Sequence, residues 1–197
     1  MNSELYLIKK IQDGDKELFA VLVDAYKERA LRTAWFFTQN WEDAKDVSQK
    51  AFIKAYRHLR SFKGSSTFYT WFYRILSNTA KDFLRSRWWH NLREHPRRTQ
   101  DGTEDPLDQV SDKKRTTTEI VMNQELFQHI GHFIGELPAG QKDVVILRYN
   151  DELSLEEIAL ALGKSIGTVK SQLFQAHQRL KNKCAQYLEG GMDHVEG

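Results

Sequence analysis

Residues 153–171 read LSLEEIALALGKSIGTVKS, and the pattern of this stretch specifies how the second half of the chain folds. Ser154 and Glu157 have the spacing of a capping box, in which the serine accepts a hydrogen bond from the backbone three residues on and the glutamate reaches back. The helix that this box opens ends at Gly163, and Ser165 is placed to cap a second helix. Two short helices joined by a tight glycine turn form a helix-turn-helix.

The second helix of this motif carries the residues expected to meet DNA. In a helix-turn-helix it enters the major groove, where its early side chains contact base edges and phosphates. Residues 164–183 hold five Lys or Arg and no acid, as phosphate contact requires. The alternative is an ordinary helical hairpin with a solvated basic face, but the capping box, the turn glycine and small Ala159 at the point of close approach favour DNA binding. The outward positions are Ser165, Thr168, Lys170, Ser171, Phe174 and His177.

The first part of the chain predicts two further amphipathic helices. Between Asn40 and Leu59, apolar residues recur at steps of three and four, which is typical of one buried stripe. This stripe consists of Ala44, Val47, Ala51, Ala55 and Leu59. A break of small residues at 62–66 precedes the other helix. Its apolar face holds Phe68, Phe72, Ile75, Thr79 and Phe83, and its polar, basic face holds Thr70, Arg74, Ser77, Lys81 and Arg85.

The basic face of that second helix predicts contact with unpaired nucleic acid. Residues 74–98 hold seven Lys or Arg and two acids, and they follow the aromatic run at 68–73. Aromatic rings beside such a face stack on bases while the cations follow the backbone. Because a helix with this spacing must bury part of its apolar face, we assign Phe72, Ile75 and Phe83 to packing. We expect Asn78 and the loop before the helix to contact bases.

Composition bounds the class of protein. The chain has 197 residues, with 29 Lys and Arg against 27 Asp and Glu, and a formal charge of +2. No apolar run is long enough to cross a bilayer, and the first residues lack the apolar stretch of a secretory signal. The single cysteine, Cys184, suits a reducing compartment. These features predict a cytoplasmic protein.

The helical periodicity in both halves of the chain predicts an all-α fold of two small helical domains joined by an acidic, flexible linker. In the linker the apolar period is lost, and residues 101–112 hold five acids and no Lys or Arg. The simplest interpretation of this segment is a solvated tether. The expected boundaries are 1–95 for the first domain, 96–119 for the linker, 120–189 for the second domain and 190–197 for a tail.

Catalytic and metal sites are not indicated. The sequence contains no evident pair of catalytic carboxylates and no glycine-rich phosphate loop, and its seven histidines lack the spacing of a zinc site. His129 and His132 share a helix face, but without a third ligand they are more simply a surface pair. We therefore expect no enzyme activity, no cofactor, no metal and no small-molecule substrate.

Together these motifs resemble the extracytoplasmic-function (ECF) sigma factors, the two-domain class of bacterial RNA polymerase specificity subunits within the sigma-70 family, and among them the RpoE-like envelope-stress group. The resemblance covers roughly residues 5–90 and 120–187. DAKDVSQKAF at 43–52 is similar to the polymerase-binding helix of the family. FKGSSTFYTWFYRI at 62–75 is similar to its promoter-melting segment, and residues 137–171 are similar to its second DNA-binding domain.

This resemblance implies an alternative sigma factor of a stress response, which binds core RNA polymerase, directs it to specific promoters and assists promoter melting. The two domains then correspond to sigma regions 2 and 4. The positions that match polymerase docking are Asp43, Asp46, Gln49 and Lys50. Those that match recognition of the minus-ten element, where a base leaves the stack, are Phe62, Lys63, Ser65, Ser66, Thr67, Arg74, Asn78, Lys81 and Arg85. The outward residues of the helix-turn-helix match positions facing the minus-thirty-five element, and the acidic linker matches a connector that threads toward the RNA exit channel.

The resemblance also implies an anti-sigma factor as a partner, often anchored in the inner membrane, which covers the polymerase-binding and DNA-binding faces. The chain departs from the family in both domains. Lys45 and Lys50 stand where acids are common, and Gln172, Gln175 and His177 replace frequent arginines. The two lysines make the docking helix less negative than is usual in the family. The departures on the recognition helix predict weaker binding to the upstream element, or an upstream element of different sequence.

Two other classes of protein explain part of the pattern. A stand-alone helix-turn-helix regulator with an unrelated helical ligand domain would bind duplex DNA without polymerase. An anti-sigma antagonist or adaptor scaffold would bind polymerase or a partner without promoter contact.

Overall fold

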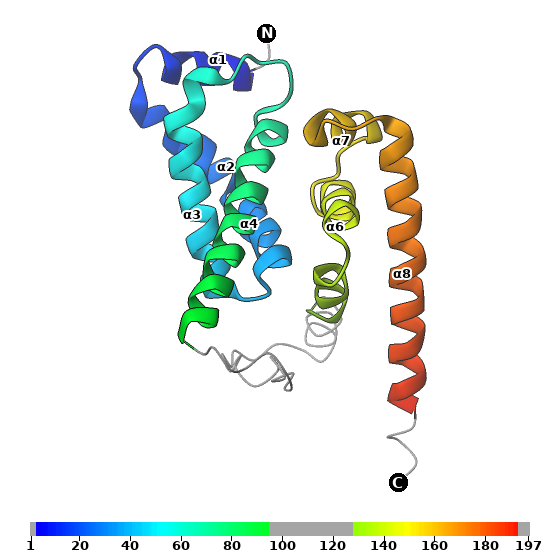
Figure 1. Cartoon of the computed structure of the whole chain (residues 1–197). Helices are drawn as coiled ribbons and strands as arrows, with labels where there is room; N and C mark the ends of the chain where they lie inside the picture. Colours follow the sequence, from blue (N-terminus) through cyan, green and yellow to red (C-terminus); the bar gives the residue numbers. More distant parts are fainter. Residues whose placement is uncertain (1–2, 95–127, 193–197) are drawn as a thin grey trace, which may run out of the picture.

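The computed structural model describes residues 3–94 and 128–192, with side chains up to Trp88 in the first range and from Gln128 to Tyr187 in the second. Within these ranges every regular element is helical and no strand occurs, which confirms the all-α fold class. The helices form two domains (Figure 1). The linker predicted at 96–119 lies outside the described residues.

The N-terminal domain is a bundle of four α-helices. They are α1 (Ser3–Gln12), α2 (Phe19–Thr38), α3 (Trp41–His58) and α4 (Phe68–Glu94), with the short 3-10 turns η1 (Lys16–Leu18) and η2 (Leu59–Ser61) between them. In Figure 1, α2, α3 and α4 lie side by side and α1 crosses their upper end. The turn from α2 to α3 is set by Gln39, which has a left-handed φ of 54°, and by the Asn40 side chain, which accepts a hydrogen bond from the Asp43 backbone N–H at 3.0 Å.

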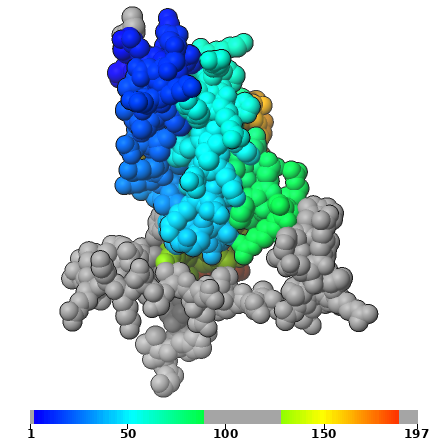
Figure 2. Space-filling view, turned by 90° about the vertical axis from the view of Figure 1, so that its left-hand side faces the viewer, coloured from blue at the N-terminus to red at the C-terminus, as the bar shows by residue number. Residues whose placement is uncertain are grey.

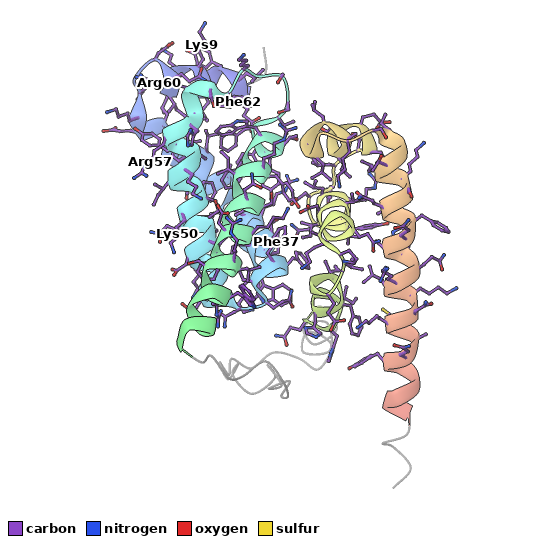
Figure 3. The ribbon with its side chains drawn as sticks, in the orientation of Figure 1. Lys9, Phe37, Lys50, Arg57, Arg60 and Phe62 are labelled. Atoms are coloured by element: carbon purple, nitrogen blue, oxygen red, sulfur yellow. The ribbon has the colours of Figure 1, made fainter. Side chains whose placement is uncertain are left out.

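The apolar stripe predicted on α3 is the face that packs against α2 and α4. It is fully buried at Ala44, Val47, Ala51 and Ala55. These small side chains let the helices approach closely, and larger rings fill the space beside them. Phe52 stacks on Phe72 with ring centroids 4.5 Å apart, and Figure 3 shows the side chains of α3 and α4 meeting between the two helices.

The C-terminal domain contains the predicted helix-turn-helix. Its elements are the helical residues 128–135, α6 (Ala139–Val145), the π-helical turn η4 (Ile146–Asn150), α7 (Leu155–Leu162) and α8 (Ile166–Met192). Ser154 Oγ accepts from the Glu157 backbone N–H at 3.2 Å, and the Glu157 carboxylate accepts from the Ser154 N–H at 2.9 Å. Gly163 ends α7 at a left-handed φ of 64°, and Ser165 Oγ accepts from the Thr168 N–H at 3.1 Å.

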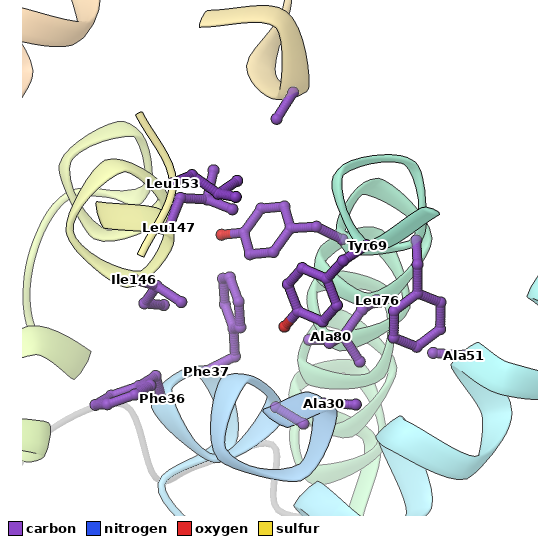
Figure 4. Packing of buried hydrophobic residues seen from close by; sticks show 14 of the residues in the cluster. Ala30, Phe36, Phe37, Ala51, Tyr69, Leu76, Ala80, Ile146, Leu147 and Leu153 are labelled. Carbon is purple, nitrogen blue, oxygen red and sulfur yellow. The ribbon is translucent and has the colours of Figure 1, made fainter. Parts of the chain in front are cut away.

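The two domains pack directly against each other and share one hydrophobic core. η4 lies against α2, and α7 lies against α4. Figure 4 shows Ile146, Leu147 and Leu153 of the C-terminal domain facing Phe37 and Tyr69 of the N-terminal domain. Full burial of each such side chain is worth roughly 1.5–3 kcal/mol, so the contact stabilises one defined arrangement of the domains.

This packing changes the expected polar face of α4. Thr70 and Ser77 belong to that face by helical spacing, yet they are only 2% and 5% exposed. Their hydroxyls are satisfied locally, since Thr70 Oγ1 pairs with Thr67 Oγ1 at 2.8 Å and Ser77 donates to the Arg74 carbonyl at 3.4 Å. Part of the predicted polar face is therefore buried, because a second domain borders it.

The carboxylate of Asp151 lies buried between the domains. Its Oδ1 accepts from Arg29 Nε and from Asn150 Nδ2, both at 2.9 Å. The Arg29 guanidinium lies over the Tyr69 ring, 3.7 Å from its centroid, and also donates to the Asp151 backbone carbonyl. Asp151 Oδ2 has no hydrogen-bond partner among the described residues. Burial raises the pKa of this carboxyl above its ordinary value, although Arg29 acts in the opposite direction.

A second carboxylate, that of Asp143, joins α6 to α4. It accepts from the Tyr73 hydroxyl and from Lys81 Nζ, each at 3.0 Å. Burial, together with this carboxylate, raises the pKa of Tyr73 well above its usual value. The phenol therefore stays protonated and serves as a hydrogen-bond donor at any physiological pH.

The raised pKa of Asp151 predicts a specific dependence of stability on pH. Between this raised native value and the unfolded value of about 3.9, the native chain binds more protons than the unfolded chain, so acidification favours the native state. We expect the free energy of unfolding of the wild type to rise, relative to that of an Asp151→Asn variant, as the pH falls through this window. Urea unfolding of both proteins over a pH series measures the difference. If the free energy of unfolding of the wild type instead falls relative to that of Asp151→Asn on acidification, Arg29 outweighs burial.

Candidate nucleic-acid interface

A small pocket lies where the predicted base-contacting loop meets the start of α4. Its volume is about 150 Å³, and its lining consists of Ser61, Phe62, Lys63, Ser65, Ser66, Thr70, Trp71, Arg74 and Leu160. Five of these residues were predicted from the sequence to meet the minus-ten element. The pocket combines an aromatic wall with cations at its edge, which is the composition that suits an unstacked base and its phosphate.

Different residues of this loop have different structural roles. Phe62 is only 7% exposed and packs against the Trp71 ring at 5.4 Å, so it forms the floor of the pocket. Thr67 accepts from the Thr70 backbone N–H at 3.2 Å and thereby caps α4. Gly64 turns the chain with a left-handed φ of 72°. Lys63, Ser65 and Thr67 are exposed at the surface.

The cations of α4 continue from this pocket along one side of the helix. Arg74 donates to the backbone carbonyls of Leu160 and Ala161, which belong to the last turn of α7. Lys81 pairs with Asp143 at 3.0 Å. Asn78 is exposed and lines, with Lys81, a cleft of about 240 Å³ between the domains. Arg85 pairs with Asp82 on its own helix at 2.7 Å.

The outward face of α8 is exposed along its first three turns. The six positions predicted for the upstream element, Ser165, Thr168, Lys170, Ser171, Phe174 and His177, are all exposed. Phe174 is the most open large apolar side chain among the described residues, at 64%. His177 Nε2 and the Tyr149 hydroxyl form a hydrogen bond of 2.6 Å. Val169 and Ala176, on the opposite face, are fully buried and orient the helix.

The residues predicted for polymerase docking lie together on α3. Asp46, Gln49 and Lys50 are exposed, whereas Asp43 is half-buried and forms an ion pair with Arg87 of α4. This pair ties the start of α3 to the middle of α4. Figure 2 looks onto the face that α3 occupies, and Figure 3 shows Lys50 and Arg57 projecting from that helix to the outside.

An apolar groove beside these residues was not predicted. It has a volume of about 450 Å³ and is lined by Phe19, Val23, Lys27, Ser48, Gln49, Phe52, Ile53 and Tyr56. Ile53 and Tyr56 are 46% and 38% exposed. The sequence does contain an indication of this groove, because Ile53 and Tyr56 lie off the buried stripe of α3, where two large apolar side chains interrupt a polar face. The groove thus places an apolar surface beside the polar residues predicted for docking.

The part of the chain that the structure describes contains no candidate metal site. No group of three or more potential ligands is present in these ranges. His132 pairs with Glu136 at 3.2 Å, and the His129 ring lies 4.5 Å from that of Tyr187. Among the described helices, none is both long and apolar enough to span a membrane.

Two families match the two domains. Residues 22–90 match Sigma-70 region 2, and residues 128–180 match Sigma-70 region 4. The ECF RNA polymerase sigma-E factor of Escherichia coli K12 is 35% identical over 184 residues, which cover 90% of this chain and 92% of that protein. The sigma-E factor of Haemophilus influenzae is 34% identical over 177 residues, covering 90% and 93%.

Solved structures share the fold over both domains. CnrH in complex with the cytosolic domain of CnrY superposes with a TM-score of 0.69 at 21% identity, covering 94% of this chain and 99% of CnrH. The sigma factor RpoE of Bartonella quintana, in complex with the anti-sigma factor NepR, gives a TM-score of 0.61 at 23% identity, covering 88% and 98%.

The two sigma domains thus occur in family order along one chain, and relatives more than 30% identical are aligned over nine tenths of its length. The chain belongs to the ECF sigma factors of the sigma-70 family, and its function is that of an alternative sigma factor in transcription initiation.

Proposed function

We propose that this sigma factor docks on core RNA polymerase through α3, seats a base of the nontemplate strand in the pocket before α4, and lays α8 on the minus-thirty-five element. The observation that supports this proposal is that one chain carries two separate surfaces whose composition suits nucleic acid. One is an aromatic and basic pocket suited to an unpaired base, and the other is an exposed recognition helix suited to duplex DNA.

Docking on polymerase uses the exposed polar residues of α3 together with the adjoining groove. An apolar groove bordered by polar side chains accepts the apolar face of a partner helix. Gln49 belongs to both surfaces, because it is exposed and also lines the groove. The Arg87–Asp43 ion pair fixes α4 relative to α3, so a polymerase helix bound here holds the promoter-melting surface in a defined place.

Opening of the minus-ten element uses the pocket between Ser61 and Arg74. A base that leaves the duplex loses a few kcal/mol of stacking and pairing. Contact with the Trp71 and Phe62 rings offsets this loss, while Lys63 and Arg74 attract the flanking phosphates. The chain contributes binding and positioning and no bond chemistry of its own, so we propose that it is not an enzyme.

Regulation is proposed to involve a cytoplasmic anti-sigma factor. The two structural neighbours were both solved in complexes, one with an anti-sigma factor and one with the cytosolic domain of CnrY. The apolar groove beside α3 and the exposed face of α8 are surfaces that such a partner can cover. The chain itself is proposed to work in the cytoplasm, where its polymerase resides.

The first test is run-off transcription with purified core polymerase on a genomic DNA library. We expect the wild type to produce transcripts from a defined set of start sites, and Asp46→Ala/Gln49→Ala to abolish both transcription and co-purification with core enzyme. The matched control is Asp13→Ala/Glu17→Ala, which removes two exposed acids of the same domain that are outside α3 and do not line the groove and should transcribe as the wild type does. Duplex binding by the isolated chain with no effect of polymerase would instead indicate a stand-alone regulator.

A second test concerns the recognition helix. If Lys170 contacts a phosphate, Lys170→Ala should weaken binding to a selected promoter and lower the slope of log K against log salt by about 0.9. Lys183→Ala is the control, because Lys183 lies on another face of α8 and pairs with Glu136. Fluorescence anisotropy of the holoenzyme over a salt series measures both slopes. Equal slopes for wild type and Lys170→Ala would remove Lys170 from the interface.

A further inference from the structure

We propose that α1 acts as a brace for the base pocket, because Glu4, Leu5 and Gln12 hold the loop that forms this pocket in the shape that receives a base. The pocket loop comprises residues 62–67, between η2 and α4. Among the described residues that line the pocket, none belongs to α1, so the three side chains are positioning residues and not DNA contacts. Capture of a base by the pocket rests on the function proposed above, whereas the brace rests on contacts within the N-terminal domain.

The helix α1 is itself anchored in the bundle. Ile8 and Ile11 are only 2% and 6% exposed and belong to the hydrophobic core. In Figure 1, α1 crosses the end of the bundle at which η2 leads into the pocket loop, and Figure 3 places Phe62 of the loop at this same end. The loop has no regular secondary structure of its own. A fixed helix therefore lies beside a segment whose shape depends on its neighbours.

Gln12, the last residue of α1, holds the start of the loop. Its Nε2 donates to the Leu59 carbonyl at 2.8 Å and to the Phe62 carbonyl at 3.0 Å. Both carbonyls lie where α3 and η2 give way to the loop, so few donors within a helix are available to them. The Phe62 ring lines the pocket. By holding the Phe62 backbone, Gln12 therefore also fixes the floor on which a base would lie.

Leu5 supports the middle of the loop. Gly64 has a left-handed φ of 72°, and a Cβ atom built on it would lie 3.3 Å from Leu5 Cδ2. The leucine side chain thus lies directly against the backbone at the point where the loop turns. Lys63 and Ser65, the neighbours of Gly64 in the chain, both line the pocket. Contact at the turn therefore limits the movement of these two side chains.

Glu4 holds the end of the loop. Its Oε2 accepts from the Phe68 backbone N–H at 3.4 Å, at the N-terminus of α4, where a negative charge is favourable. Its Oε1 accepts from the Tyr26 hydroxyl of α2. Burial, together with the Glu4 carboxylate, raises the pKa of Tyr26 above its ordinary value, so the phenol keeps its proton and remains a donor. The carboxylate is thus fixed by α2 on one side and holds α4 on the other.

The three contacts are spaced along the whole loop, at its start, its turn and its end. A loop that became ordered only when the base bound would lose conformational entropy at that moment, and this loss would weaken binding. A loop that α1 already holds has lost this entropy on folding. The brace therefore predicts that residues of α1 change how tightly a captured base is bound, although they do not touch the base.

Two variants, Gln12→Met and Leu5→Ala, remove the brace by different routes. Methionine favours a helix and leaves the charge unchanged, but it donates no hydrogen bond to the two carbonyls. Gln12→Lys restores a donor at the same place and should behave as the wild type. Leu5→Ala withdraws the support of Gly64 at a side chain that is 37% exposed, so little of the core is lost. The matched control is Lys9→Met, at an exposed position on the outer side of the same helix (Figure 3).

The order of the loop is measured on the full chain by electron paramagnetic resonance. Every protein carries Cys184→Ser and a spin label at Ser65→Cys, an exposed position of the loop. We expect a restricted label in the wild type, Gln12→Lys and Lys9→Met, and a more mobile label in the two brace variants. Circular dichroism verifies folding, and Leu5→Ala carries the test if Gln12→Met does not fold. An unchanged line shape in the folded brace variants would overturn the proposal, and equal mobility in Gln12→Lys and Gln12→Met would overturn the hydrogen-bonding role of Gln12.

Base capture is measured with holoenzyme assembled from the same variants without the label and its two substitutions. The wild-type holoenzyme selects a single strand of roughly 12 nucleotides from a random pool, and this strand is compared with fluorescein-labelled copies that carry one abasic site each. An abasic copy keeps all its phosphates, so the ratio of the two affinities does not depend on the charge of the protein. We expect one abasic site to weaken wild-type binding about tenfold and to weaken binding by the brace variants only about twofold. Gln12→Lys and Lys9→Met should keep the wild-type ratio.

The two measurements distinguish failure of the brace from failure of the proposed function. If one abasic site weakens binding equally for the wild type and for folded Gln12→Met and Leu5→Ala, the brace is refuted and base capture stands. If the label becomes more mobile in these variants but no abasic site weakens wild-type binding, the brace stands and the proposed capture of a base fails.

Discussion

The carboxylate of Asp151, buried between the two domains, constrains the rest of the structure. A buried carboxylate is costly unless it is paired and hydrogen-bonded, and its partners here come from both domains, with Arg29 on α2 and Asn150 on η4. Satisfying it places η4 against α2. That contact in turn places α7 beside α4, where Arg74 finds the free carbonyls of the last helical turn. The position of one acid thus determines which surfaces remain available.

Much of the fold could be predicted because its local signals agree with one another. The capping box at Ser154 and the left-handed turn at Gly163 specify the helix-turn-helix without reference to any distant residue. The stripe on α3 specifies a buried face because alanines at helical spacing have no other role. The loop before α4, which was predicted to contact bases, lines a small pocket, since small residues next to an aromatic run favour a turn beside a ring-lined surface.

The packing of the domains could not be predicted from the same signals. Thr70 and Ser77 have polar side chains on a basic face, and helical periodicity alone places them in solvent. Asp143 and Asp151 stand at the ends of a short apolar segment, where an acid most simply begins or ends a helix. Their burial depends on partners more than 60 residues away in the chain, Lys81 at 62 and Arg29 at 122. Periodicity carries no information about such pairs.

The small net charge of the chain acquires a structural meaning from these pairs. The formal charge of +2 conceals basic segments whose cations differ in how far they are paired with acids or carbonyl groups. On α8 the cations face outward, and Lys170 is exposed. On α4, Arg74 and Lys81 are engaged by groups of the other domain. Since charge attracts nucleic acid only where it is unpaired and accessible, the arrangement of acids leaves the cations of the proposed DNA surface on α8 more accessible than those of the proposed surface on α4.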